Sequence, residues 1–211
     1  MNQEKFYKAL SEGKMEEVKN LTQKALDRGE KAEDILSQGL IKAMDQIGVK
    51  FKNNEIYIPE VLIAARAMHA GLGVLKPILA KSTTFTTAKI VLGTVKGDLH
   101  DIGKNLVGMM LEGGGFEVVD IGIDAPPEKF IQAAKEHGAK IIGMSALLTT
   151  TMMQMKATIE MIKSSGMGVK MIVGGAPLTA EFARQIGADG YAADAASAVG
   201  KVKELLGMRR Y

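Results

Sequence analysis

The 211-residue chain contains no cysteine and no tryptophan, and only 5% of its residues are aromatic. Without cysteine it has no disulfide, no thiolate metal ligand and no thiol nucleophile, which fits a reducing compartment. The excess of one sign of charge over the other is also small, because 27 basic and 24 acidic residues leave a net charge of +3. This charge is too small to indicate a nucleic-acid partner or a membrane surface. We therefore expect a cytoplasmic protein with no nucleic-acid and no membrane partner.

Several motifs are missing as well. The first residues lack the apolar core of a signal peptide, and no apolar run reaches the ~18–20 residues that a bilayer span needs. Neither Gly-x-x-x-x-Gly-Lys-Ser/Thr nor Gly-x-Gly-x-x-Gly occurs at the first strand-to-helix loop, which excludes a phosphate-binding loop there. Of the three histidines only His100 lies in such a loop. A metallohydrolase site would need a second or third ligand cluster there, and no second histidine supplies one.

Residues 1–82 carry apolar residues at helical spacing in four runs, which predicts a small helical bundle. Pro59 suits the first turn of the fourth helix, and Pro77 should bend or end it. Residues 83–87 are polar and β-branched, as an extended linker would be.

From residue 88 to 211 short apolar runs alternate with helical patterns. Strands are predicted at 89–95, 117–121, 140–145, 169–173 and 190–192, and helices at 102–113, 127–137, 150–165, 179–186 and 195–206. Because parallel neighbours need helical crossovers, this alternation predicts an α/β domain with a doubly wound, five-stranded parallel sheet. We expect the flavodoxin-like (Rossmann-type) strand order 2-1-3-4-5.

In such a sheet the loops after the strands form one site. The first loop offers Asp98 and His100, the third a row of hydroxyls after Ser145, and the fourth the pair Gly174-Gly175. A carboxylate can hold one ring N–H of His100 while the other ring nitrogen binds a metal. A single imidazole is weak for zinc but suffices for a metal that arrives in a macrocycle. The alternative is a solvated histidine beside turn-forming residues.

Asp98-x-His100-x-x-Gly103, followed by Ser145-x-Leu147 and Gly174-Gly175, resembles the signature of a known cofactor-binding domain. It is the cobalamin-binding domain of methionine synthase, the coenzyme-B12 mutases and the corrinoid proteins of methyltransferase systems. The stretch GDLHDIGKNLVGMMLEGGGFEVVDIG is most similar to methionine synthase and the corrinoid methyl carriers. The earlier stretch IYIPEVLIAARAMHAGL resembles the helical cap that precedes this domain in the carriers.

The resemblance implies that cobalamin binds with its own base off the cobalt and His100 on it, as the axial metal ligand. Asp98 would bond the far ring nitrogen, and Ser145 would continue this chain, so that these three residues form the catalytic set. The cofactor-binding residues that it implies are Asp98, Leu99, His100, Asp101, Ile102, Gly103, Ser145, Leu147, Thr149, Thr151, Gly174, Gly175, Ala176, Tyr191, Ala192 and Asp194. The hydroxyls would line the channel of the cofactor tail, and the glycines would let its nucleotide pass.

The implied function is that of a methyl carrier with methylcobalamin, or a related corrinoid, as its loaded form. The implied partners are a substrate-specific corrinoid methyltransferase, a second methyltransferase acting on tetrahydrofolate or a thiol, and a reductive activator. Such a subunit is not expected to turn over alone. Two alternatives remain open, the cobalamin subunit of an adenosylcobalamin-dependent mutase and a B12-dependent sensor or regulator.

Overall fold

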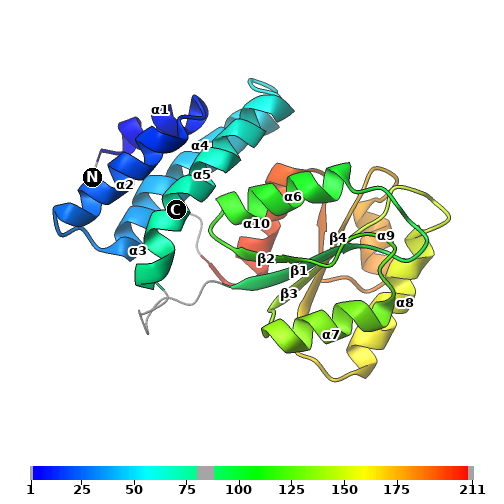
Figure 1. The fold of residues 1–211 in the computed structure, drawn as a ribbon. Coiled ribbons are helices and arrows are strands. Elements are labelled where there is room, and N and C mark those ends of the chain that lie inside the picture. Colours follow the sequence, from blue (N-terminus) through cyan, green and yellow to red (C-terminus); the bar gives the residue numbers. More distant parts are fainter. Residues whose placement is uncertain (1, 80–87, 209–211) are drawn as a thin grey trace. The chain divides into compact units, whose positions relative to one another are not determined.

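The computed structural model describes residues 2–79 and 88–208, apart from the side chain of Lys52. The chain divides into two compact units, residues 1–87 with 112–115 and residues 88–111 with 116–211 (Figure 1). The first is the helical unit and the second the sheet unit. The predicted linker at 83–87 lies outside the described residues.

The helical unit is built from amphipathic helices. Its elements are α1 (Gln3–Ser11), α2 (Met15–Asp27), α3 (Ala32–Asp34), the π-helical segment η1 (Ile35–Ile41), α4 (Lys42–Lys52) and α5 (Ile58–Leu79). The backbone stays helical from α3 through η1 to α4, so these three form the third of the four predicted helices. Apolar residues three or four positions apart share one helix face, and those that build the core include Phe6, Leu10, Val18, Leu36, Leu40, Met68 and Leu75.

Helix α5 is long and apolar enough to cross a membrane by length and composition, with a mean hydropathy of 1.4 in its most apolar window. It does not contain an uninterrupted apolar run of that length, because Glu60 and Arg66 lie within it. Val61, Met68 and Leu75 are fully buried, as in the core helix of a bundle. Pro77 lies in its last turn, and α5 ends two residues later.

The sheet unit has the predicted topology. Its strands are β1 (Lys89–Thr94), β2 (Glu117–Asp120), β3 (Ile141–Ser145), β4 (Lys170–Gly174) and β5 (Gly190–Ala192), all parallel, in the order β2-β1-β3-β4-β5. The crossover helices are α6 (Ile102–Gly113), α7 (Pro127–His137), α8 (Met152–Ser164), α9 (Ala180–Gln185) and α10 (Ala195–Leu205). This confirms the expected fold class and strand order.

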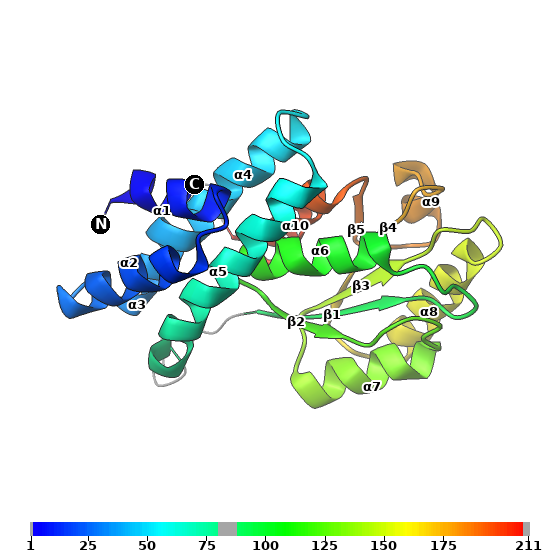
Figure 2. The ribbon, with the colours of Figure 1, turned by 45° about the horizontal axis from the view of Figure 1, so that its top comes forward.

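Helices cover both faces of the sheet (Figure 2). Phe130 of α7 and Ile159 of α8 pack with Val91, Ile142 and Val173 of the central strands on one face. Helices α6 and α10 lie on the opposite face (Figures 1 and 2). Because both faces are covered, the central strands are apolar without alternation.

The strand register brings the carboxyl ends of four strands into one row. Thr94 of β1 pairs with Ser145 of β3, Ser145 with Gly174 of β4, and Gly174 with Ala192 of β5. The loops that follow these residues therefore begin side by side at one edge of the sheet. This edge is where ligands bind in open α/β sheets.

Candidate functional site

The loop between β1 and α6 presents a histidine held by a buried carboxylate. Asp98 is fully buried, whereas the side chain of His100 is 50% exposed. The Nδ1 atom of His100 lies 2.8 Å from Oδ1 of Asp98, and the backbone N–H of His100 donates to the same oxygen at 3.1 Å. The ring is thus anchored on one side and open on the other.

The second carboxylate oxygen of Asp98 binds the loop that follows β3. Oδ2 accepts hydrogen bonds from Thr151 Oγ1 at 2.7 Å, from the backbone N–H of Leu147 at 2.8 Å and from that of Leu148 at 3.3 Å. Burial alone would raise the pKa of Asp98, but the hydrogen bonds from Thr151, Leu147 and His100 outweigh it and hold the pKa well below its usual range. One ionised carboxylate therefore ties two loops together.

This carboxylate determines the tautomer of His100. An ionised carboxylate is only an acceptor, so Nδ1 of His100 carries the proton and donates it to Asp98. The other ring nitrogen, Nε2, then has a free electron pair on the side of the ring away from Asp98. Among the residues described, no group of three or more His, Asp or Glu side chains could hold a metal ion. The site therefore offers one imidazole ligand, which suits a metal that brings its other ligands with it.

Backbone and side-chain hydrogen bonds fix the His100 loop from below. Thr94 Oγ1 donates to the carbonyl of His100 at 2.9 Å. The backbone N–H of Asp124 donates to the carbonyl of Asp98 at 3.0 Å, and the N–H of Gly97 donates to Oδ1 of Asp124 at 2.7 Å. Asp124 is not among the predicted site residues, because those lie at or after the ends of the other four strands and Asp124 lies in the loop after β2.

A second residue that was not predicted is Lys104, in the first turn of α6. Its side chain is almost fully buried, forms an ion pair with Asp120 at the end of β2 and donates to Asn105 Oδ1 at 2.8 Å. Buried charges require such partners. The pair joins the start of α6 to the neighbouring strand, so Lys104 supports the His100 loop.

The hydroxyl that reaches Asp98 is not the predicted one. Ser145 is partly buried at the end of β3, and its carbonyl accepts from the N–H of Val95 at 3.0 Å. Within the described part of the chain, Thr151 makes the hydroxyl bond to Asp98 that the resemblance implied for Ser145. The correction has a simple geometric origin, because the turn after β3 brings Thr151 back toward β1.

The two glycines after β4 have a reason within the chain itself. A Cβ on Gly174 would lie 2.9 Å from the carbonyl oxygen of Ala192, and one on Gly175 would overlap the carbonyl oxygen of Ala146. Gly175 also has φ +137°, which side chains disfavour. The backbone of the neighbouring loop thus lies against Gly175, and the passage of a cofactor nucleotide stays a prediction.

Gly103 is different, because its surroundings do not require glycine. It lies in the first turn of α6, where an added Cβ would meet no atom of the described residues within 4 Å apart from its chain neighbours and the helix backbone, and its φ is ordinary. Around it lie exposed apolar side chains, of which Ile102 is 84% and Leu99 66% exposed. The third loop adds Leu147 at 43%. An apolar surface with free space beside an imidazole indicates a large, partly apolar ligand.

The remaining predicted residues fall into two groups. Asp101, Thr149 and Ala176 are exposed in the loops at the same edge of the sheet. Tyr191 donates its hydroxyl proton to the carbonyl of Leu178 at 2.9 Å, Ala192 is buried, and Asp194 caps α10 by accepting from the N–H of Ser197 at 2.7 Å. The β5 residues thus have structural partners, and their contact with a cofactor stays a prediction.

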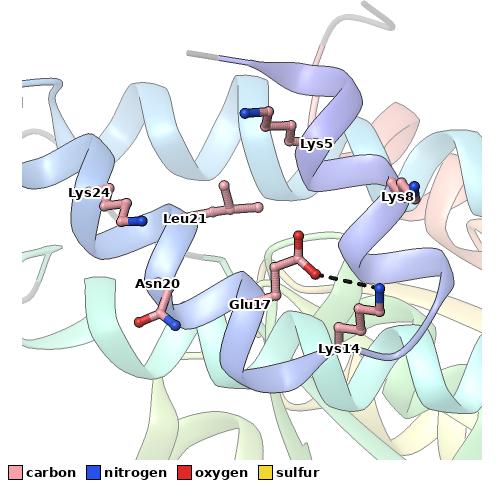
Figure 3. A pocket seen from close by; sticks show the side chains of 7 residues that line it. All are labelled: Lys5, Lys8, Lys14, Glu17, Asn20, Leu21 and Lys24. Atoms are coloured by element: carbon pink, nitrogen blue, oxygen red, sulfur yellow. Dashed lines mark ion pairs between the residues drawn. The ribbon is translucent and has the colours of Figure 1, made fainter.

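A separate hollow of about 550 Å³ lies in the helical unit between α1 and α2 (Figure 3). It is lined by Lys5, Lys8, Lys14, Glu17, Asn20, Leu21 and Lys24. Lys14 pairs with Glu17 at 3.8 Å. This lining contains no imidazole and is mainly basic, so it does not resemble the site at His100.

Comparison with known proteins agrees with this geometry. Residues 88–200 match the family model of a B12 binding domain, and residues 3–76 match a second model of the same description. A corrinoid protein of Desulfitobacterium hafniense is 43% identical over 204 residues, which cover 94% of both chains. The dimethylamine corrinoid protein of Methanosarcina barkeri is 46% identical over 82% of this chain and 83% of its own length.

A solved structure also resembles the whole chain. The methanol:cobalamin methyltransferase complex of Methanosarcina barkeri contains a chain that is 28% identical, with a TM-score of 0.83. The match covers 97% of the present chain and 79% of that one. It therefore includes both the helical bundle and the sheet.

Proposed function

Because the chain belongs to the family of B12-binding corrinoid proteins, we propose that it shuttles a methyl group between two methyltransferases. Corrinoid is its cofactor. In the proposed complex the cofactor's own base is off the cobalt and Nε2 of His100 takes its place. The observation that carries this proposal is the half-exposed imidazole whose other nitrogen is held by the buried carboxylate of Asp98.

The residues present fit a corrinoid on three counts. Nε2 of His100 lies on the side of the ring away from Asp98, its electron pair is not used by that carboxylate, and half of the side chain is exposed, so it could bind a metal. The apolar side chains of Leu99, Ile102 and Leu147 would contact the flat macrocycle. Gly103 leaves open space at the start of α6, where a side chain would meet such a ring.

Each residue then has a defined task. The corrinoid supplies the chemistry of methyl transfer through its cobalt. His100 would hold the metal through Nε2, and Asp98 keeps the proton on Nδ1 so that Nε2 stays available as a ligand. The apolar side chains beside the imidazole would exclude water from the metal when the cofactor is bound. The hydrogen bonds of Thr94 and Asp124 hold the His100 loop in place.

The proposed partners follow from what the relatives are named for. One is a dimethylamine corrinoid protein, and one structure is a methanol:cobalamin methyltransferase complex. We therefore propose that a substrate-specific methyltransferase loads the chain from a small methylated compound such as a methylamine or methanol. A second methyltransferase that acts on tetrahydrofolate or a thiol would unload it, and a reductive activator would restore oxidised cofactor.

His100→Ala tests the proposal, with His137→Ala as the matched control. Both histidines are exposed in the sheet unit, and His137 ends α7. We expect both variants to fold and bind cobalamin, because the tail interactions remain. Only His100→Ala should change the absorbance spectrum of the bound cofactor and slow methyl transfer from the partner.

Two results would contradict the proposal. One is a spectrum of the wild-type complex that shows cobalamin still coordinated by its own base. The other is a His100→Ala complex whose spectrum equals that of the wild type and of His137→Ala.

A further inference from the structure

Thr151 occupies the capping position of α8 without capping it. Threonine at the start of a helix commonly accepts a hydrogen bond from a backbone N–H of the first turn, a bond worth about 1 kcal/mol. Here the side chain makes no such bond, although Thr151 is the N-cap residue of α8. Thr151 is 6% exposed, and its hydroxyl is directed at Asp98 instead. The hydroxyl therefore has a task other than capping the start of the helix.

The hydroxyl of Thr151 has one proton and two acceptors. Oγ1 lies 2.7 Å from Oδ2 of Asp98 and 2.9 Å from the carbonyl oxygen of Leu148. Both distances are ordinary for hydrogen bonds of a hydroxyl. Since both partners only accept, the proton serves one of them at a time, and rotation about the C–O bond exchanges them.

The orientation of this proton changes how strongly Asp98 binds His100. With the proton on Asp98, the carboxylate accepts five hydrogen bonds and its charge is widely shared. With the proton on Leu148, four remain, and the carboxylate becomes a stronger acceptor for the Nδ1–H of His100. A stronger bond at Nδ1 makes Nε2 a better electron donor.

We propose that Thr151 is the positioning residue that orients Asp98 and, through its rotating hydroxyl, adjusts the donor strength of Nε2 of His100. The inference rests on the proposed function in one respect, because Nε2 is taken to face cobalt. In this proposal the hydroxyl that bonds Asp98 comes from Thr151 at the start of α8 and not from Ser145, where it was expected. The device needs no movement of the backbone, since only one proton changes its partner.

The test uses Thr151→Val, which keeps the shape and removes the hydroxyl, and Thr151→Ser, which keeps the hydroxyl. Thr150→Val is the matched control, because Thr150 is exposed in the same turn. Thr151→Ala serves as a second variant without the hydroxyl if the valine variant does not fold. Ser145→Ala tests the alternative hydroxyl.

The first readout is the NMR signal of the His100 Nδ1–H in the protein without cofactor, which is independent of corrinoid binding. Thr151→Val should shift this proton signal downfield, because Asp98 then binds it more strongly. Thr151→Ser and Thr150→Val should leave it in place. An unchanged signal in Thr151→Val, or a shift that Ser145→Ala produces instead, would overturn the proposal.

The second readout uses the protein loaded with cob(II)alamin. Thr151→Val should keep the nitrogen splitting of the axial ligand in the electron paramagnetic resonance spectrum. It should favour the histidine-bound state up to about tenfold, which shifts the Co(II)/Co(I) potential by up to about 59 mV to more negative values. A shift of the potential to more positive values would mean that Thr151 only stabilises the loop, and would overturn the proposed adjustment of Nε2. If even the wild-type protein shows no nitrogen splitting, the proposed function fails, while the first readout still decides the role of Thr151.

Discussion

Replacing Asp98 by asparagine keeps the size of the side chain but exchanges one acceptor oxygen for an NH₂ group. The two oxygens of Asp98 face different sets of donors, so the amide has two orientations. If the NH₂ group faces the third loop, it meets the backbone N–H groups of Leu147 and Leu148, and both lose their acceptor. If it faces His100, only the backbone N–H of that residue loses its acceptor, provided that the ring gives up its Nδ1 proton.

The second orientation leaves one unpaired donor instead of two, so we expect Asp98→Asn to adopt it. One buried unpaired N–H costs roughly 1–3 kcal/mol of the free energy of unfolding. The larger consequence is chemical, because Nδ1 of His100 then accepts from the amide and the proton moves to Nε2. A protonated Nε2 has no electron pair for a metal, so the variant should fold and lose the axial ligand.

Two measurements on the protein without cofactor check this prediction. Urea unfolding gives the loss of stability, and ¹⁵N NMR of the imidazole gives the tautomer of His100. Asp101→Asn is the control for stability, because Asp101 is exposed and, among the described residues, its side chain accepts from Asn105 alone, at 3.1 Å. The change in its free energy of unfolding should stay within about 0.5 kcal/mol. If Asp98→Asn keeps the wild-type stability, or keeps the proton on Nδ1, the reasoning about the buried carboxylate is wrong.

Three further predictions concern stability and cofactor space. Gly103→Ala should raise the free energy of unfolding by up to about 1 kcal/mol in urea titrations yet weaken corrinoid binding measured by absorbance, and tighter binding would contradict the free space inferred there. Gly175→Ala should cost at least about 1–3 kcal/mol in the same assay, because of its positive φ and the overlap with Ala146, whereas Gly168→Ala, with no atom within 4 Å, should cost far less. The lowered pKa of Asp98 contributes stability that is complete above the ordinary carboxyl value of about 3.9 and is lost progressively as the pH falls from there toward the lowered pKa of the folded state. Circular dichroism should therefore show a steeper loss of stability below about pH 4 for the wild type than for Asp98→Asn.

The sheet could be predicted closely because its signals are local. Short apolar runs between helical patterns placed each strand to within about a residue, and the crossovers required parallel pairing. His100 and Asp98 were also predictable, since residues two apart in a loop are close by connectivity alone. The hydrogen bond between them follows from that proximity.

What the sequence did not reveal depends on the path of a loop through space. Ser145 and Thr151 are both hydroxyl residues after β3, and only the turn between them decides which one reaches Asp98. The same holds for Asp124, whose backbone fixes the His100 loop from a different connection. Glycine patterns likewise do not tell a position crowded by the chain, as at Gly175, from one with open space, as at Gly103.

The hydrogen bonds beneath the β1–α6 loop have a consequence for how fast and how tightly a ligand is captured. Thr94, Asp124 and Asp98 restrain the backbone and ring of His100 through hydrogen bonds that the chain makes with itself. The entropy of ordering this segment is therefore lost during folding and not again at association. A ligand that binds at Nε2 of His100 therefore meets a nitrogen whose orientation the chain itself has fixed, which favours both rapid and tight capture.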